Sequence, residues 1–235
     1  MADGEERQTQ AQRSASTRAK LARAAFDQLR LNGYAQFRTA TVARNAGVSQ
    51  GGQLHHFPTK EALALAAIEH AYDSVQRATA DSLARHDRAD ASAIDTLRAL
   101  LDDCMAFYFS STFDVALDVV KGAAGNVALR RQIAQLSRSY RGYTEQAWQT
   151  RFTARGLSER DAIDLIDLST ALVRGFAIRR WIHKDSGQFK RLLERWVELV
   201  AVGVPSLAPA PRQLRALRGG GTSAARTVSP RRVRR

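Results

Sequence analysis

The stretch that most constrains the fold spans residues 38–60 and reads RTATVARNAGVSQGGQLHHFPTK. Its apolar and capping residues fall at the spacing of two short helices joined by a three-residue turn. We expect Thr39 to cap the first helix, Gly47 to end it in a left-handed conformation, and Ser49 to cap the second. Thr59 then caps a third helix. The pattern therefore predicts a helix-turn-helix.

Two short helices that cross at a glycine-containing turn form a shape whose second helix fits the major groove of B-DNA. The alternative is an ordinary corner between two core helices. Caps, turn glycine and basic flank occur together at consistent spacing, which favours the DNA-binding interpretation. We expect Leu54 and Phe57 to point back to the first helix.

The remaining residues of this stretch divide into two predicted kinds of DNA contact. Those expected to face base edges are Gln50, Gly51, Gly52, Gln53 and His55. Here the glycines allow the backbone to approach the DNA, and a glutamine side chain can pair with adenine. Those expected to hold phosphates and fix the register are Arg38, Thr39, Arg44, His56 and Lys60.

The segment ATVARNAGVSQGGQLHHFPTKEAL resembles the DNA-binding motif of the tetracycline-repressor-type (TetR/AcrR) transcriptional regulators. The residues that match in register are Val42, Ala43, Ala46, Gly47, Val48, Ser49, Gly51, His56, Phe57, Lys60 and Leu63. Two positions depart from the family pattern. Gln53 replaces an apolar residue and brings a polar group near the core, and Leu54 replaces a tyrosine whose hydroxyl could donate to a phosphate.

The resemblance implies a homodimeric DNA-binding regulator, most often a repressor, that binds a palindromic operator in double-stranded DNA. A small-molecule effector, whose identity the sequence does not give, would release it.

The distribution of charge agrees with DNA binding. The net charge of +13 divides into −1 for residues 1–13, +6 for residues 14–60, a balance of zero for residues 61–203 and +8 for residues 204–235. A positive field confined to the motif and the tail suits phosphate binding.

The whole chain is predicted to be all-α, because it has only five prolines, is rich in alanine, leucine and arginine, and has few β-branched runs. We expect about nine helices and no strand, the first from about Ser16 to Asn32. The expected divisions are a disordered N-terminal arm (1–13), a helix-turn-helix DNA-binding domain (14–60), a ligand-binding and dimerisation domain (61–205) and a disordered arginine-rich tail (206–235).

Two consecutive helices near the C-terminus are more apolar than one core contact requires, which predicts a four-helix dimer interface. Burial of both helices inside one protomer is the alternative. The predicted interface residues are Leu165, Leu172, Phe176, Phe189, Leu193, Trp196 and Val200. Candidate effector-pocket residues, each of which could instead be plain core packing, are Met105, Phe109, Phe113, Tyr143, Trp148 and Phe176.

Other function classes receive little support. The single cysteine, Cys104, cannot form an internal disulfide, and no leader or membrane-spanning stretch is present, so we expect a cytoplasmic protein without membrane contact. No catalytic motif, cofactor loop or metal-binding motif occurs. We expect Asp161, Asp164 and Asp167, which share one helical face, to form a solvated acidic stripe, with a cation site as the alternative. A helical small-molecule carrier or partner-binding protein stays an alternative to the DNA-binding regulator. For an enzyme, the sequence offers no set of candidate catalytic residues.

Overall fold

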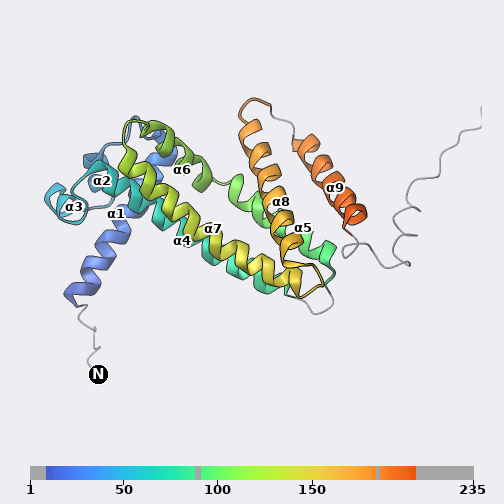
Figure 1. Ribbon diagram of the computed structural model, residues 1–235. Helices are drawn as coiled ribbons and strands as arrows, with labels where there is room; N and C mark the ends of the chain where they lie inside the picture. Colours follow the sequence, from blue (N-terminus) through green and yellow to red (C-terminus); the bar gives the residue numbers. More distant parts are fainter. Residues whose placement is uncertain (1–8, 88–90, 184–185, 205–235) are drawn as a thin grey trace, which may run out of the picture.

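The computed structural model describes residues 9–87, 91–183 and 186–204. These ranges contain nine helices and no strand, which confirms the all-α prediction. The helices are α1 (Gln10–Asn32), α2 (Thr39–Asn45), α3 (Gln50–His56), α4 (Lys60–His86), α5 (Ala93–Tyr108), α6 (Ser111–Gly122), α7 (Val127–Thr153), α8 (Glu159–Arg179) and α9 (Ser186–Gly203). The short helices α2 and α3 lie at one end of the molecule, and α8 and α9 at the other, with α4 and α7 running between them (Figure 1).

Local capping chemistry sets most of the helix starts. The Ser49 hydroxyl accepts a hydrogen bond from the N–H of Gly52 at 3.1 Å, and the Thr59 hydroxyl accepts one from Ala62 at 3.0 Å. Gly47 has a φ of 66°, the left-handed conformation that the sequence predicted. The prediction for Thr39 was wrong. Arg38 occupies the N-cap of α2 without a side-chain bond, and Thr39 is the first helical residue.

The first helix begins earlier than the sequence suggested. Gln10 is its first residue because Thr9 and Gln12 form a capping box: the Thr9 hydroxyl accepts from Gln12 N at 3.2 Å, and Thr9 N donates to the Gln12 side chain at 2.7 Å. Residues 10–13 are therefore helical and do not belong to a disordered arm. Thr9, which caps this helix, is also described, whereas residues 1–8 of the predicted arm and the predicted tail, 206–235, lie outside the described residues.

Two hydrophobic clusters hold the helices together. The first joins α1, α2 and the start of α4 to α6 and the start of α7, with Leu21, Phe37, Val119 and Ile133 at its centre. The second joins α5, α7, α8 and α9, and its largest buried side chain is Trp148. Because α6 and α7 contribute to the first cluster, the helix-turn-helix packs directly on the helices behind it. None of the helices in the described ranges is long and apolar enough to cross a bilayer.

Candidate nucleic-acid interface

The exposed face of α3 consists of four residues at helical spacing. Gln50 and Gly51 lie one turn before Leu54 and His55, and all four are exposed. Gly52, the remaining glycine, is partly covered, because a Cβ built on it would meet Cγ1 of Val48 at 3.1 Å. Of the residues predicted to reach base edges, Gln50, Gly51 and His55 thus share one open face.

Gln53 does not belong to that face. Its side chain is 0% exposed, its Nε2 donates to the carbonyl of Phe57 at 2.6 Å, and its Oε1 has no hydrogen-bond partner. Leu54, by contrast, is 48% exposed. The predictions that Gln53 faces DNA and that Leu54 packs inward were both wrong. Phe57 is buried, and position 53 lies one helical turn before it on the same side of α3. The side chain at position 53 is therefore buried even though it is polar.

The predicted phosphate-binding residues lie around the exposed face of α3. Arg38, Arg44 and Thr39 are exposed or partly exposed near α2. Lys60 is already engaged within the protein: its Nζ donates to the carbonyl of Tyr34 at 3.0 Å and lies 4.3 Å from the centre of the Tyr34 ring. Its ammonium therefore attaches the start of α4 to the loop between α1 and α2.

A contact that the sequence did not reveal joins α1 to the end of α3. Nη1 of Arg18 donates to the carbonyl of His56 at 3.1 Å, and the guanidinium lies 4.5 Å from the centre of the Phe57 ring. Desolvation, His55 and Arg18 together lower the pKa of His56 below its usual 6.5. The imidazole is therefore neutral at pH 7 and can still donate one N–H to a phosphate.

The predicted pocket residues do not line a single cavity. Phe113 and Trp148 line a partly open cavity of about 180 Å³ among α4, α5, α6, α7 and α8. Met105 and Phe109 line a separate hollow of about 450 Å³ between α5 and α9. Tyr143 is exposed, and Phe176 is buried against Phe189 with ring centres 4.9 Å apart. Neither is a pocket residue, because Tyr143 lies on the outer side of α7 and Phe176 lies in the contact between α8 and α9.

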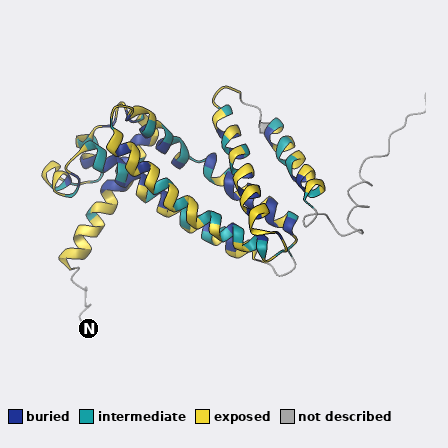
Figure 2. Cartoon of the chain, in the orientation of Figure 1, coloured by how far each residue is buried: buried dark blue, intermediate teal, exposed yellow. Residues whose placement is uncertain are grey.

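Four of the predicted interface residues are buried inside the protomer itself: Leu165, Phe176, Phe189 and Val200. They belong to the core rather than to a surface that a partner can reach, which corrects this part of the prediction. Leu172, Leu193 and Trp196 are partly exposed. Figure 2 shows exposed residues along the outer faces of α8 and α9. The large apolar residues among them include Leu168 on α8 and Leu199 and Val202 on α9.

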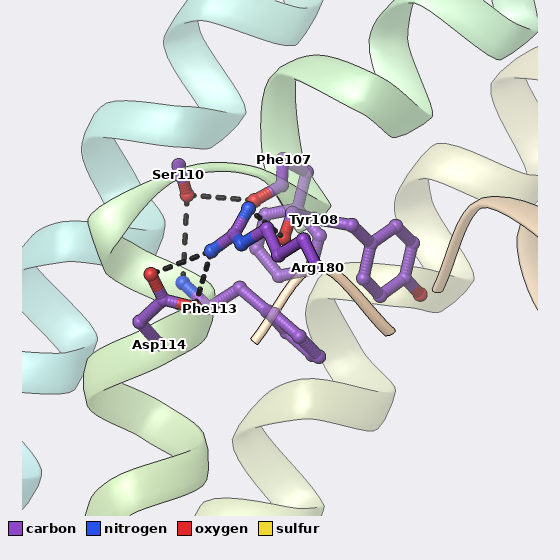
Figure 3. A network of polar contacts seen from close by, with 6 residues as sticks. All are labelled: Phe107, Tyr108, Ser110, Phe113, Asp114 and Arg180. Atoms are coloured by element: carbon purple, nitrogen blue, oxygen red, sulfur yellow. Dashed lines mark hydrogen bonds and ion pairs between the residues drawn. The ribbon is translucent and has the colours of Figure 1, made fainter. Parts of the chain in front are cut away.

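A polar network ties the end of α8 to the junction of α5 and α6 (Figure 3). Nη2 of Arg180 donates to both carboxylate oxygens of Asp114 at 2.5 and 2.6 Å, and Nη1 donates to the carbonyl of Tyr108 at 3.3 Å. The hydroxyl of Ser110 donates to the carbonyl of Phe107 at 2.7 Å in the same turn. The backbone that carries the cavity-lining rings of Phe107, Tyr108 and Phe113 is therefore held from two sides.

The described residues contain no group of side chains that could hold a metal ion. Burial raises the pKa of the Cys104 thiol to about 12, so this cysteine stays protonated and behaves as a small core residue. Its Sγ lies 3.7 Å from the hydroxyl of Thr170.

Comparison with known proteins identifies relatives of this chain. Residues 21–67 match the family model for bacterial regulatory proteins of the tetR family. The HTH-type transcriptional regulator CymR of Pseudomonas putida is 38% identical over 193 residues, which cover 82% of this chain and 93% of that protein.

Solved structures of TetR-family and related regulators share the fold. A TetR-family regulator from Mesorhizobium loti superposes with a TM-score of 0.68 at 16% identity, over 81% of this chain and 97% of its own. A transcriptional regulator from Saccharomonospora viridis, solved in complex with choline, superposes with a TM-score of 0.61 at 19% identity. The match covers 78% of this chain and 96% of that one.

Proposed function

The chain belongs to the TetR family of DNA-binding transcriptional regulators, and on this premise we propose that it is a homodimeric repressor that a small-molecule effector releases from a palindromic operator. The family consists of regulators rather than enzymes. The observation that carries the proposal is the open face of α3, where Gln50, Leu54 and His55 stand free of the protein core.

Each exposed side chain on this face suits one kind of contact in the major groove. Gln50 can pair with adenine and His55 can hydrogen-bond a base edge, whereas Leu54 offers only apolar contact, which suits the methyl group of thymine. Arg38 and Arg44 of the neighbouring α2 segment and His56 at the end of α3 would hold phosphates. Leu54 thus takes the place in our proposal that the sequence had given to Gln53.

The homodimer is supported by two apolar stripes. On α8, Leu168, Leu172 and Ile178 follow one another at helical spacing, with Gly175 open between the last two. On α9, Leu192, Trp196, Leu199 and Val202 do the same. Two copies that pack these stripes together would form a four-helix interface at the end of the molecule away from α3. The symmetry axis would then set the distance between the two recognition helices.

We assign the effector to the cavity of about 180 Å³ among α4, α5, α6, α7 and α8. Phe107 and Phe113 line it on either side of the turn that leads from α5 into α6. Further along α6, Asp118 accepts a hydrogen bond from the N–H of Tyr34, next to α2. A ligand that favours a different position of α6 would shift the helix-turn-helix, provided that it binds the two conformations with different affinities.

The proposal is tested by a mobility-shift assay with the purified full chain on fragments of its own promoter region and on sites selected by genome-wide footprinting. We expect a selected palindrome to bind at least about 1,000-fold more tightly than random duplex. Gln50→Ala and His55→Ala should reduce this preference, whereas Gln146→Ala on the exposed surface of α7 should not. Equal affinity for selected and random duplex would reject specific recognition.

The dimer is tested separately by sedimentation of the free protein. Leu199→Asp should convert dimers into monomers, because it places a charge in the apolar stripe of α9. Leu31→Asp is the control, since Leu31 is an exposed leucine on α1, outside both stripes (70% exposed, against 52% for Leu199). A wild-type protein that sediments as a monomer at micromolar concentration would contradict the homodimer.

A further inference from the structure

The effector cavity has the size and lining of a site for one aromatic ring. Its volume of about 180 Å³ is close to the roughly 150 Å³ of an apolar cavity that binds benzene. Six aromatic side chains contribute to its wall: Tyr72, Phe107, Tyr108, Phe113, Tyr140 and Trp148. Flat rings of this kind pack well against a flat ligand.

Four charged side chains also line the cavity, and three of them are engaged by the protein. Asp103 accepts from the hydroxyl of Thr79 at 3.0 Å and from the indole N–H of Trp148 at 3.2 Å. Glu145 and Arg141 form an ion pair at 3.8 Å near the mouth.

Arg174 is the fourth charged residue of the cavity. It is partly buried, and its guanidinium makes no hydrogen bond or ion pair with any residue in the described ranges. An arginine held in a mostly apolar wall without an acidic partner is unfavourable unless an anion binds there. Arg174 is therefore the one charged side chain of this lining to which the described residues offer no hydrogen bond or ion pair.

A hydroxyl beside Arg174 is also available. The hydroxyl of Tyr72 lies 3.1 Å from the hydroxyl of Ser137, and the hydroxyl of Tyr140 lies 3.4 Å from that of Thr79. The hydroxyl of Tyr108, by contrast, has no hydrogen-bond partner among the described residues. In Figure 3 the ring of Tyr108 points away from Arg180. The guanidinium of Arg180 contacts Tyr108 through the backbone carbonyl of Tyr108 and not through its hydroxyl. Desolvation raises the pKa of Tyr108 to about 12, although Arg174 acts against this shift. The hydroxyl therefore keeps its proton and can donate.

We propose that the effector is a small monocyclic aromatic carboxylate, whose carboxylate binds Arg174 and the Tyr108 hydroxyl while its ring packs among Phe107, Phe113 and Trp148. Arginine suits this group because its planar guanidinium can donate two parallel hydrogen bonds to a carboxylate. A cationic ligand would lie near the unpaired guanidinium of Arg174, which repels it. The inference rests on the proposed function, in which this cavity is the effector site.

Isothermal titration of the full chain without DNA tests the ligand class. The probes are benzoate, 4-methylbenzoate and phenylacetate, each paired with the amide of the same shape. We expect at least one carboxylate to bind and its amide to bind about 10- to 100-fold more weakly, which is the effect of one charge-assisted contact. Arg174→Gln should remove this difference, and Arg174→Lys should retain part of it.

Arg138→Gln is the control for long-range charge, because Arg138 is exposed on α7 and does not line the cavity. We expect it to change carboxylate affinity by less than about threefold. The melting temperature of each variant without ligand shows that it folds. The inference is overturned if no carboxylate binds at millimolar concentration, if the amides bind as tightly as the acids, or if Arg174→Gln leaves the preference unchanged.

The mobility-shift assay with and without the bound carboxylate separates this inference from the proposed function. Release of the operator supports both. Binding of the carboxylate without release would overturn its role as effector, while the ligand class of the cavity would stand. If the ligand-free protein showed no specific DNA binding, the proposed function and the effector role would be contradicted, while the ligand class of the cavity would stand.

Discussion

The backbone N–H of Tyr34 donates to Oδ2 of Asp118 at 2.7 Å, across 84 positions of sequence. Tyr34 lies in the loop between α1 and α2, and Asp118 lies in the middle of α6. The ring of Tyr34 also receives the ammonium of Lys60 at 4.3 Å. The loop that precedes the helix-turn-helix is thus held by α6 and by α4 at once, and a movement of α6 cannot leave it undisturbed.

We predict that Asp118→Ala lowers the free energy of unfolding by about 1–3 kcal/mol, because the partly buried N–H of Tyr34 loses its acceptor. Urea unfolding followed by circular dichroism measures this change. Asp102→Ala is the control, since Asp102 is an exposed aspartate on α5 without a hydrogen-bond partner among the described residues. Similar losses in both variants would mean that the contact with Tyr34 contributes nothing specific.

The contact between Gly122 and Tyr34 gives a second prediction. A Cβ at position 122 would lie 2.7 Å from Cδ1 of Tyr34 and 3.3 Å from its Cβ, near the root of a buried ring that has little room to turn. Gly122→Ala should therefore cost about 1–3 kcal/mol of stability and weaken operator binding by displacing the loop. Gly125→Ala, with nothing within 4 Å, should be neutral or slightly stabilising. Equal melting temperatures for the two variants would show that Tyr34 moves aside freely.

These long-range contacts mark the limit of what the sequence could predict. Gly47, Ser49 and Thr59 were assigned correctly because each acts on backbone groups within a few residues of itself. The contact of Tyr34 with Asp118, and the isolation of Arg174, depend on how helices far apart in the sequence pack. No local pattern encodes either relationship.

Gln53 and Leu54 show a different kind of failure. Their polarity predicted Gln53 outside and Leu54 inside, but helix geometry fixes position 53 behind the buried ring of Phe57. The four-residue spacing from Phe57 was present in the sequence and outweighs the polarity of a single residue. The same reasoning explains the dimer residues, because Leu165 and Val200 lie on the inner sides of α8 and α9.

Matched substitutions within α3 test the corrected register. Gln53→Glu puts a charge at a buried position next to the carbonyl of Phe57, so it should lower the free energy of unfolding by about 3 kcal/mol or more. Gln50→Glu should leave the melting temperature within about 2 °C of wild type, because Gln50 is exposed, and should weaken DNA binding by repulsion. If Gln53→Glu were as stable as Gln50→Glu, position 53 would not be buried in solution.

The lowered pKa of His56 predicts a pH-dependent affinity for DNA. In the free protein the pKa lies below 6.5, so the imidazole is neutral at pH 7. A phosphate beside it would favour the imidazolium and raise the pKa in the complex. The complex then binds more protons than the free protein between the two pKa values, and affinity should rise as the pH falls through that window.

Operator affinity measured at pH 8 and pH 6, at constant ionic strength, checks this sign. His56→Gln should flatten the dependence while keeping a hydrogen-bond donor at the position. His55→Gln is the comparison, because His55 lies on the exposed face of α3 and is assigned to base edges instead. An unchanged slope in His56→Gln would place the titrating group elsewhere.

The exposure of Leu54 predicts that part of the operator is read through methyl groups. Replacing one thymine by deoxyuridine removes only the methyl group from the major groove and leaves every hydrogen-bonding group in place. At the base pair that Leu54 contacts, this change should cost about 1 kcal/mol of binding free energy. In Leu54→Ala the same deoxyuridine site should bind as well as the thymine site, because the contact is already lost. In His55→Ala the preference for thymine should persist. If Leu54→Ala kept the full preference for thymine at every position, the methyl group would be read by another residue, and Leu54 would only fill space beside the DNA.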